Sequence, residues 1–564
     1  MYYKRTKMKK CDNNKNKLTI IIPFVNEGDE VENTIISILD NSNNDVEIIV
    51  INDASDDNID YEQKLRKYPI RYTCNHKRIG VAASRDKGVR LCETDYFLLL
   101  DAHMRFYNSG WVHSIVQELN KNSELLLCAQ TKVLKKENGI IIENQHFRNY
   151  WGAYVNFYTP ICFLEAQWTY SDWSLPKEKR DAQIIPCILG AGYATSKSYW
   201  LYLCGLEGLL SYGSDEVLIS MKVWLAGGQC KLMPNVVIGH IYRCSSPYEH
   251  YTERRIYNRI FISQLLCSVT IQKKLFAIEK IKHPQEYWDA WKLYYDNLDF
   301  VIRNALSFKK KIKKEFSSFE KFNSSYKYID REPIEKKEKF LLRCVIYIVS
   351  YMNSTNRIGL LNGKMGIVIL LFYYAKYKKN IYIANLANKF LKEVINNINI
   401  YDSLTISDGL LGIGWAVCYL FQQRFISDNI NEFLYSIDQR VLEISPCRMV
   451  DLNIDYGLGG VLRYVLCRLY NTNDVSETGL SLVFLSDLYN CAKKVIDENL
   501  FNTCPETYVE YILFYEKKIE MSPASIYEIL MLPGWNRYSK NVKDISLRGL
   551  TGMCLEYLLT TSIE

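Results

Sequence analysis

The chain has 564 residues, of which 48% are hydrophobic and 24% are charged, and its formal net charge is +7. This length exceeds what one hydrophobic core supports, so we expect at least two domains. The small net charge argues against a protein that binds nucleic acid along a basic surface. Two basic runs, at residues 1–17 and 309–314, could touch an anionic membrane surface, although a solvated tail and a solvated helix face are the simpler interpretation.

The cysteines and the apolar runs bear on location. The 17 cysteines are scattered without a CxxC pair, and no apolar signal segment follows Met1. We therefore expect free thiols in a reducing compartment. No apolar run approaches the ~20 residues of a membrane span. The sequence predicts a cytoplasmic protein, at most peripheral to the inner membrane face, and its richness in Asn, Lys, Ile and Tyr suggests a bacterial genome rich in A and T.

The first elements in chain order predict an α/β domain. Leu18–Phe24 (LTIIIPF) is a continuous apolar run, typical of a strand buried on both faces. Apolar residues then recur at helical spacing, and a second buried strand at 46–51 leads into an acidic turn that contains Asp53. Parallel sheets bind ligands beyond the carboxyl ends of their strands, so this edge is a candidate site.

The strongest site pattern follows a third apolar strand at 95–100 (DYFLLL). That strand leads directly into Asp101-Ala102-His103. A carboxylate and an imidazole two positions apart in an extended chain project to the same side, so both can bind one divalent cation. Taken alone, the pair is explained about as well by a capping aspartate and a packed histidine. Its position after an apolar strand favours the metal site.

Seven ordered motifs then give a resemblance to a known family. They are LTIIIPFVNE, VINDASDD, RIGVAASRDKGV, LLLDAH, ILGAGYATSKSYW, GSDEVLISMKVWLAGG and VVIGHIYR. In order and spacing they resemble family 2 glycosyltransferases of the GT-A fold, and they look closest to the polypeptide N-acetylgalactosaminyltransferase branch. The resemblance implies a Rossmann-like, mostly parallel sheet and transfer of a sugar from a nucleotide-sugar, with a UDP-sugar as the favoured donor.

The resemblance also implies a set of site residues. The residues expected to bind the metal are Asp101, His103 and His240. Two imidazoles and one carboxylate suit Mn²⁺ better than Mg²⁺, which prefers oxygen ligands, although Mg²⁺ remains the alternative. The residues expected to contact the donor are Pro23, Asn26, Glu27, Asp53, Arg85, Asp101, Gly190 and Gly192. The residues expected to act in catalysis are Asp215, Glu216, Arg243 and Tyr248.

The roles implied for these residues differ. Asp53 would approach the nucleoside with Arg85 beside it, and the glycines would let the backbone pass close to the sugar. Asp215 would address the sugar or the acceptor hydroxyl, although acidic residues at a helix N-terminus are also ordinary caps. Arg243 and Tyr248 would belong to a loop that closes over the diphosphate. Ser246 stands where the resembled enzymes have a loop histidine, and their lectin repeats are absent, so acceptor and stereochemistry stay open.

The second half carries a glycine-punctuated repeat. Four GxxG elements begin at Gly363, Gly409, Gly457 and Gly549, at separations of 46, 48 and 92 residues. A period in the forties indicates stacked helical hairpins. The pattern resembles the α/α toroid of lanthionine synthetase C-like proteins, whose cyclases hold zinc through two cysteines and a histidine. Leu547 and Arg548 stand where that family's cysteine–histidine pair would be, so we expect a zinc-free domain that binds a partner or has a structural role.

We therefore predict four segments: a basic tail at 1–17, a GT-A domain at 18–270, a helical basic connector at 271–340, and an all-α toroid-like domain at 341–564. The predicted function is metal-dependent transfer from a nucleotide-sugar to an acceptor hydroxyl, with a peptide or protein acceptor favoured over a glycan. One alternative is an enzyme of surface polysaccharide synthesis whose second domain is purely structural. A lanthionine-type cyclase is disfavoured by the missing zinc ligands, and an inactive scaffold by the retained metal set.

Overall fold

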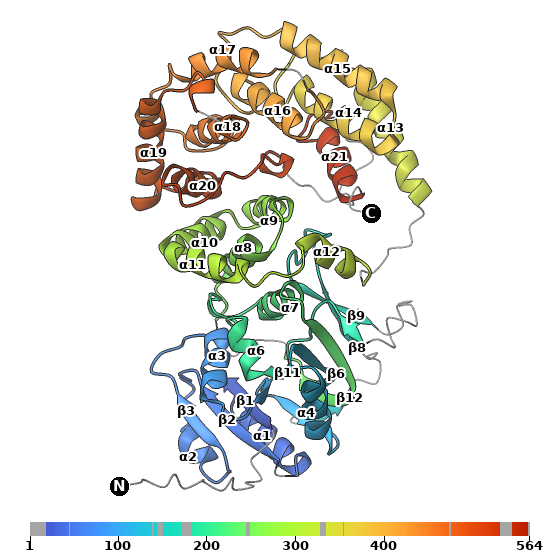
Figure 1. Cartoon of the computed structure of the whole chain (residues 1–564), viewed down its shortest axis with the longest axis vertical. Helices are drawn as coiled ribbons and strands as arrows, with labels where there is room; N and C mark the ends of the chain where they lie inside the picture. Colours follow the sequence, from blue (N-terminus) through green and yellow to red (C-terminus); the bar gives the residue numbers. More distant parts are fainter. Residues whose placement is uncertain are drawn as a thin grey trace, which may run out of the picture. The chain divides into compact units, whose positions relative to one another are not determined.

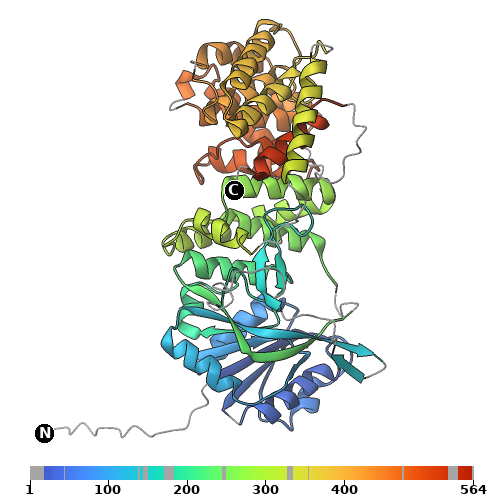
Figure 2. The same ribbon diagram turned by 90° about the vertical axis from the view of Figure 1, so that its right-hand side faces the viewer.

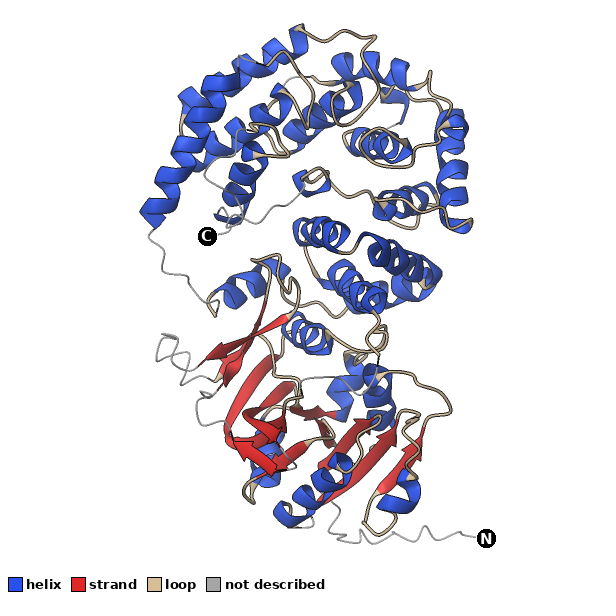
Figure 3. Ribbon diagram, turned by 180° about the vertical axis from the view of Figure 1, so that it is seen from behind, coloured by secondary structure: helices blue, strands red, loops and turns tan. Residues whose placement is uncertain are grey.

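The structure is a computed structural model that describes residues 18–561 except 44, 138–139, 144–149, 171–182, 244–248, 327–333, 353–354, 428, 473–474 and 531–543. The chain forms two compact units that alternate along the sequence. Unit 1 takes in Met1–Asn156, Leu164–Tyr251 and Arg303–Tyr328, and unit 2 takes in Phe157–Phe163, Thr252–Ile302 and Ile329–Glu564. Every described strand belongs to unit 1, whereas unit 2 is helical (Figure 3). Among the described residues, no helix is long and apolar enough to cross a membrane.

Unit 1 contains a large mixed sheet and a separate two-stranded sheet. Its strands are β1 (Leu18–Phe24), β2 (Val46–Asn52), β3 (Arg71–Cys74), β4 (Tyr96–Leu100), β5 (Met104–Phe106), β6 (Leu125–Glu137), β7 (Ile140–Glu143), β8 (Tyr150–Val155), β9 (Ala166–Tyr170), β10 (Ile184–Ile185), β11 (Gly192–Ser196) and β12 (Gln229–Ile241). Ten strands form one twisted sheet in the order β10-β12-β6-β11-β4-β1-β2-β3, with β5 on β12 and β7 on β6, while β8 pairs with β9 separately (Figure 2).

The direction of the strands divides this sheet. From β3 through β2 and β1 to β4 all neighbours are parallel, as the apolar runs of the sequence predict. β11 then runs antiparallel to both β4 and β6, and β12 is parallel to β6. The predicted α/β fold of the N-terminal half is confirmed. The antiparallel insertion of β11 was not specified by the sequence patterns.

Helices cover both faces of the sheet. In unit 1 they are α1 (Glu30–Asn41), α2 (Tyr61–Leu65), α3 (Val81–Leu91), α4 (Trp111–Lys121), α6 (Lys197–Tyr202), α7 (Asp215–Leu225) and α12 (Phe316–Ser324). Alternate residues of β1 pack on opposite faces. Ile20 and Ile22 join the core formed with α1, α2 and α4. Ile21 faces α3 so closely that a Cβ on Gly88 would lie 2.2 Å from its side chain. Burial on both faces explains the continuous apolar run.

Unit 2 is a repeat of helical hairpins. Its helices are α8 (Thr252–Leu266), α9 (Val269–Lys282), α10 (Pro284–Asp296), α13 (Ile334–Met352), α14 (Lys364–Lys378), α15 (Ile381–Asn396), α16 (Leu410–Gln422), α17 (Asn431–Val441), α18 (Leu458–Tyr470), α19 (Leu482–Asp497), α20 (Pro505–Tyr515) and α21 (Leu550–Thr561). Among the described residues, three short 3-10 helices, η1 (Pro446–Arg448), η2 (Val475–Glu477) and η3 (Ile526–Glu528), lie between them. The almost wholly buried α14, α16 and α18 contact one another in series, and α15, α17 and α19 lie outside them (Figure 1).

The GxxG elements start the inner helices. Gly409 and Gly457 immediately precede α16 and α18, and their backbones are extended. A Cβ on Gly409 would lie 1.9 Å from the carbonyl oxygen of Ser403, and one on Gly457 would lie 2.3 Å from that of Asp451. The loop before each helix folds back onto the helix start, so a side chain has no room there. The predicted α/α repeat is confirmed. The close approach of the backbone at each helix start explains why the repeat has glycine there.

The compact units divide the chain differently from the predicted domain bounds. α8 and α9, at the end of the predicted transferase domain and the start of the connector, pack within unit 2, where Lys273 of α9 lies 2.7 Å from Glu510 of α20. α11 (Leu298–Lys309) runs from unit 2 into unit 1 along the chain. Within the basic run at 309–314, Lys314 lies 4.1 Å above the ring of Trp224, so this run is partly anchored. The tail at 1–17 lies outside the described residues.

Candidate active site

Three predicted metal ligands meet at one edge of the sheet in unit 1. Asp101 directly follows β4, and His103 directly precedes β5. The antiparallel pairing of β5 with β12 sets His240 opposite Met104. This register brings His240 beside His103, which lies 137 positions earlier in the chain. One possible ligand atom from each of Asp101, His103 and His240 lies within 4.8 Å of the others.

The geometry and charge of this trio suit a divalent cation. His240 Nε2 lies 3.1 Å from His103 Nε2 and 3.6 Å from Asp101 Oδ2. Burial lowers the pKa of His240, against the opposing effect of Asp101. Burial alone would raise the pKa of Asp101, but the hydrogen bond from His240 and the charge of Arg85 lower it to about 2. An ionised carboxylate and a neutral imidazole are the forms that bind metals, so the donor set fits Mn²⁺.

Arg85 is the buried centre of this edge. Its Nη2 donates to Asp101 Oδ1 at 2.8 Å, and its Nη1 donates to Asp215 Oδ2. The guanidinium also lies 5.4 Å from the ring centre of Tyr193. Arg85 therefore occupies one oxygen of Asp101 and leaves the other facing His240. Sequence reasoning placed Arg85 beside the nucleoside, whereas the structure brings it to a predicted metal ligand and a predicted catalytic carboxylate.

The start of α7 carries the two predicted catalytic carboxylates. Asp215 is buried against Arg85, so its carboxylate has a partner other than the helix N-terminus. Burial and the neighbouring Asp215 raise the pKa of Glu216 well above its usual range. A Cβ on Gly190 would lie 1.9 Å from Glu216 Oε1, whereas the nearest atom to a Cβ on Gly192 is 3.3 Å away. The missing side chain of Gly190 makes room for the Glu216 carboxyl, which explains the glycine independently of any sugar.

Glu27 connects the trio to Arg243. Its Oε2 lies 3.3 Å from His103 Nδ1, and its carboxylate accepts hydrogen bonds from both terminal nitrogens of Arg243. Burial would raise the pKa of Glu27, but His103 and Arg243 lower it. Arg243 directly precedes residues 244–248, so Tyr248 and Ser246 lie outside the described residues.

Asp53 holds a neighbouring loop in place. Its Oδ1 accepts from Ile79 N at 2.9 Å and from Asn75 Nδ2 at 2.8 Å, and its Oδ2 accepts from Gly80 N at 2.8 Å. A carboxylate offers about four acceptor positions. Three are taken by the chain itself, so the predicted contact with a nucleoside has one position left. We did not predict that Asp53 holds this loop, because its hydrogen-bond partners lie more than twenty residues away in the sequence.

The other residues predicted at this edge contact one another. Asn26 donates through Nδ2 to Asp56 Oδ1 at 2.7 Å and accepts from Asp56 N at 2.9 Å. Its backbone φ of 54° is left-handed, a conformation that asparagine tolerates better than most residues. Pro23 stands opposite Ile51 in the pairing of β1 with β2. These contacts fix the turn that follows β1 against the turn that follows β2.

Two aromatic residues beside the trio were not predicted. The ring of Tyr242 lies 4.3 Å edge-on to that of His240. Trp168 of β9 lies 5.5 Å from Tyr242 and is 37% exposed. Residues 240 and 242 share one side of an extended chain, so the period of two along VVIGHIYR could have indicated Tyr242. Trp168 carries no such signal, because only tertiary packing brings β9 there.

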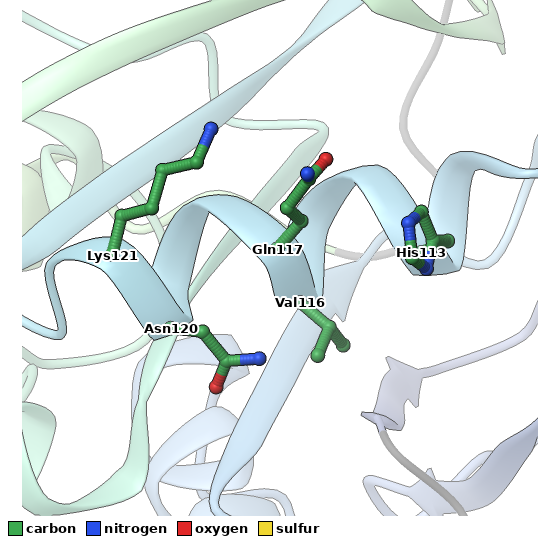
Figure 4. Close-up of a pocket in the computed structure, with 5 residues that line it drawn as sticks. All are labelled: His113, Val116, Gln117, Asn120 and Lys121. Atoms are coloured by element: carbon green, nitrogen blue, oxygen red, sulfur yellow. The ribbon is translucent and has the colours of Figure 1, made fainter.

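A separate shallow pocket lies on α4. It is lined by His113, Val116, Gln117, Asn120 and Lys121 (Figure 4). All five side chains come from this one helix, and none is a predicted site residue. We assign this pocket no role in the chemistry.

Comparison with known protein families finds one match in each half of the chain. Residues 19–178 match the family described as Glycosyl transferase family 2. Residues 324–515 match the family described as Lanthionine synthetase C-like protein. The chain carries a domain of each family. The resemblance drawn from the sequence motifs is thereby confirmed.

Curated relatives match the first half. Polypeptide N-acetylgalactosaminyltransferase 3 of Drosophila melanogaster is 26% identical over 246 residues, which cover 41% of this chain and 35% of the relative. The human polypeptide N-acetylgalactosaminyltransferase 10 is 28% identical over 240 residues, which cover 41% of this chain and 38% of the relative. This chain thus spans well under half the length of the curated relatives it matches.

Two solved structures show weaker likeness. The crystal structure of GalNAc-T7 with UDP, GalNAc and Mn²⁺ has a TM-score of 0.43 and 20% identity, covering 56% of this chain and 59% of that one. Mannosyltransferase PcManGT from Pyrobaculum calidifontis, in complex with GDP-Man and Mn²⁺, has a TM-score of 0.32 and 14% identity, covering 55% of this chain and 85% of that one.

Proposed function

We propose that this chain is a glycosyltransferase that moves a sugar from a UDP-sugar to an acceptor hydroxyl, with one divalent cation, preferably Mn²⁺, at Asp101, His103 and His240. The observation that carries the proposal is the convergence of these three side chains within 4.8 Å in a domain that matches glycosyl transferase family 2. A bound Mn²⁺ would supply Lewis-acid neutralisation of the donor's diphosphate.

The surrounding residues have separate tasks in this proposal. Arg85 holds Asp101 and Asp215 in fixed positions through one guanidinium. The raised pKa of Glu216 favours its neutral carboxyl, which can donate a hydrogen bond to a sugar hydroxyl without repelling the diphosphate. Arg243 is exposed at the same edge and would stabilise charge on the leaving diphosphate.

The choice of UDP rests on the family resemblance, together with the one acceptor position left on Asp53 for a nucleobase N–H. Isothermal titration calorimetry against UDP, GDP and TDP, each with Mn²⁺, tests it on the full chain. We expect the tightest binding for UDP and loss of that binding in EDTA. Tighter binding of GDP or TDP would reject the choice of nucleotide while leaving the metal site standing.

We favour a peptide or protein acceptor. The relatives in sequence are polypeptide N-acetylgalactosaminyltransferases, and the second half matches lanthionine synthetase C-like proteins. A second domain that holds a peptide would raise its effective concentration at the transferase site. The competing acceptor is a glycan, as in surface polysaccharide synthesis, with unit 2 acting only as structure.

The acceptor test needs the full-length chain. The two units alternate along the sequence, so a cut near Lys339 would leave α8–α10 of unit 2 attached to unit 1. We therefore propose incubating the intact protein with UDP-sugars, Mn²⁺ and either serine- and threonine-containing peptides or lipid-linked glycans. Mass spectrometry should show addition of one sugar to peptides. Transfer to glycans alone would contradict the peptide acceptor.

Two further assignments stay proposals. A cyclase function is disfavoured because Leu547 is buried and Arg548 binds Asp455 at the positions of the family's cysteine–histidine pair. The predicted membrane contact depends on the basic tail at 1–17, which lies outside the described residues, and the cytoplasmic location stays an expectation from the scattered cysteines. Cell fractionation of the full chain, compared with one lacking residues 2–17, checks them.

A further inference from the structure

Glu27 lies between a predicted metal ligand and an exposed arginine. Its side chain is only 6% exposed. Its Oε2 lies 3.3 Å from Nδ1 of His103, while Nε2 of the same ring faces His240 at 3.1 Å. The Glu27 carboxylate also accepts two hydrogen bonds from Arg243. The sequence assigned Glu27 to the donor nucleotide, but the structure turns its carboxylate toward His103 and Arg243.

This arrangement has a direct consequence for metal binding. A histidine that donates its second ring N–H to a carboxylate is held in the tautomer whose other nitrogen is a free ligand, and its ring orientation is fixed. His103 has such a carboxylate. His240 does not, because its Nδ1 is buried with no hydrogen-bond partner in the described structure. The two imidazoles therefore differ in how firmly they are oriented.

We propose that Glu27 is a positioning residue that holds His103 as a metal ligand through Nδ1, and that its bonds to Arg243 tie this arginine to the metal site. The proposal rests on the metal site of the proposed function. It assigns Glu27 to the support of the metal ligand, and it gives Arg243 a fixed place beside the trio.

The test is Mn²⁺ affinity, measured by electron paramagnetic resonance of free Mn²⁺ on the full chain without nucleotide. Loss of an outer carboxylate of this kind typically weakens metal binding about 10–100-fold, and we expect this loss for Glu27→Gln. The matched control is Glu32→Gln. Glu32 is a half-buried glutamate of α1 that bonds Tyr68 and Lys67 at 2.8 Å and touches none of the three ligands. Its substitution should leave Mn²⁺ affinity unchanged.

The outcomes separate this inference from the proposed function. If the wild-type chain binds Mn²⁺ and a folded Glu27→Gln chain binds it within about two-fold, the positioning role is wrong and the metal site stands. If the wild-type chain binds no Mn²⁺, both fail. Circular dichroism confirms folding. Should Glu27→Gln not fold, Glu27→Asp keeps the charge and withdraws it by one methylene, and the same weakening of Mn²⁺ binding is required.

A second and independent observation concerns two thiols of unit 2. Cys447 of η1 and Cys491 of α19 lie with their sulfurs 3.1 Å apart, although they are 44 positions apart in the chain. Cys447 is exposed, and Cys491 is partly buried. Burial, followed by the contact with Cys447, raises the pKa of Cys491 to about 12. The accessible thiol is thus positioned to react first, with the second thiol in reach of its sulfur.

We infer that Cys447 and Cys491 form a reversible disulfide by exchange with a low-molecular-weight disulfide such as glutathione disulfide. The thiolate of Cys447 attacks one glutathione sulfur and releases the first glutathione. The sulfur of Cys491 then loses its proton and attacks Cys447, which releases the second glutathione. Two protein thiols are oxidised and one glutathione disulfide is reduced to two glutathiones, so atoms and electrons balance.

Peptide mapping under non-reducing conditions tests this on the full chain after treatment with glutathione disulfide. We expect a cross-linked peptide pair that contains Cys447 and Cys491 and disappears on reduction. In Cys491→Ser, Cys447 should instead retain a glutathione adduct, and in Cys447→Ser neither product should form. A wild-type chain in which Cys447 keeps its adduct, or stays unmodified, would overturn the inference.

Discussion

The sheet edge in unit 1 and the starts of the inner helices in unit 2 are both places where the resembled families hold a metal. In unit 1 the expected ligands Asp101, His103 and His240 converge. In unit 2 the corresponding positions hold Leu547 and Arg548, and Arg548 pairs with Asp455. A fold can thus keep its backbone while the chemistry of its site changes, so each site must be argued from its own side chains.

The backbone of unit 2 shows how much of the repeat persists without those ligands. Leu547 N donates to Leu361 O at 2.9 Å, and Leu361 N donates to Ser407 O at 2.8 Å. Ile406 N in turn donates to Asp455 O at 3.0 Å. Equivalent loops of successive repeats are therefore joined in a chain of hydrogen bonds. The repeat accounts for these bonds by itself, with no ligand set required.

The largest expected effect is at the trio. Asp101→Ala removes the carboxylate from the trio of expected metal ligands, and loss of several kcal/mol of charge stabilisation should lower kcat/KM for donor hydrolysis at least about 10³-fold. The same variant should lose stoichiometric Mn²⁺ binding by calorimetry.

The difference between the two regions can be tested by measuring bound zinc. Atomic emission spectroscopy would measure it in a variant in which all three expected ligands of unit 1 are changed to alanine. We expect no bound zinc, and one equivalent retained would place a metal site in unit 2.

Arg85 should come next, as a determinant of stability. Arg85→Met leaves Asp215 buried without its cation, and breaking a buried pair by removing one partner costs about 3–5 kcal/mol. Urea unfolding of the full chain measures this loss in the free energy of unfolding. Adding Asp215→Asn in the same chain should restore part of the stability, because no uncompensated charge is then buried. If the double variant is no more stable than Arg85→Met, the ion pair is not the cause.

A pH effect is expected in unit 2. Burial raises the pKa of Glu556 from 4.5 to about 7. Between these values the folded chain keeps a proton that the unfolded chain releases, so the stability contributed by Glu556 is full below pH 4.5 and is lost as pH rises through 7. At pH 8 we therefore expect Glu556→Gln to have a larger free energy of unfolding in urea than the wild type, by at most about 3 kcal/mol. Near pH 4.5 the two should coincide, and an equal difference at both pH values would contradict the assignment.

The smallest effect tests the space beside Glu216. Gly190→Ala places a Cβ where it meets Glu216 Oε1 at 1.9 Å, so the carboxyl must move. A displacement of about 1 Å in an active site can cost up to 10²-fold, and we expect a loss of about 10-fold in kcat/KM. Gly192→Ala is the matched control, because its Cβ comes no closer than 3.3 Å to Ile238. Equal losses in both variants would remove the special role of Gly190.

The sequence predicted elements better than it predicted partners. Leu18–Phe24 and the strand before Asp101 were found because burial on both faces leaves a continuous apolar run. The proximity of Asp101, His103 and His240 was predicted because their motifs are local and follow one another in a specific order. The contacts of Arg85, Glu27 and Asp53 were not predicted, because each contact joins two segments whose closeness in space is not indicated by their order in the sequence. The compact units differed from the predicted domain bounds for the same reason, because helices α8 and α9 have no motif that assigns them to a unit.

Metal-dependent use of a nucleotide-sugar is tested by hydrolysis of UDP-, GDP- and TDP-sugars by the purified full chain, followed as release of the nucleoside diphosphate. We expect release from a UDP-sugar with Mn²⁺, no release in EDTA, and recovery when Mn²⁺ is restored. Asp101→Ala should stay inactive under all three conditions. Release that persists without metal, or in a folded Asp101→Ala chain, would contradict a metal-dependent transferase centred on Asp101, His103 and His240.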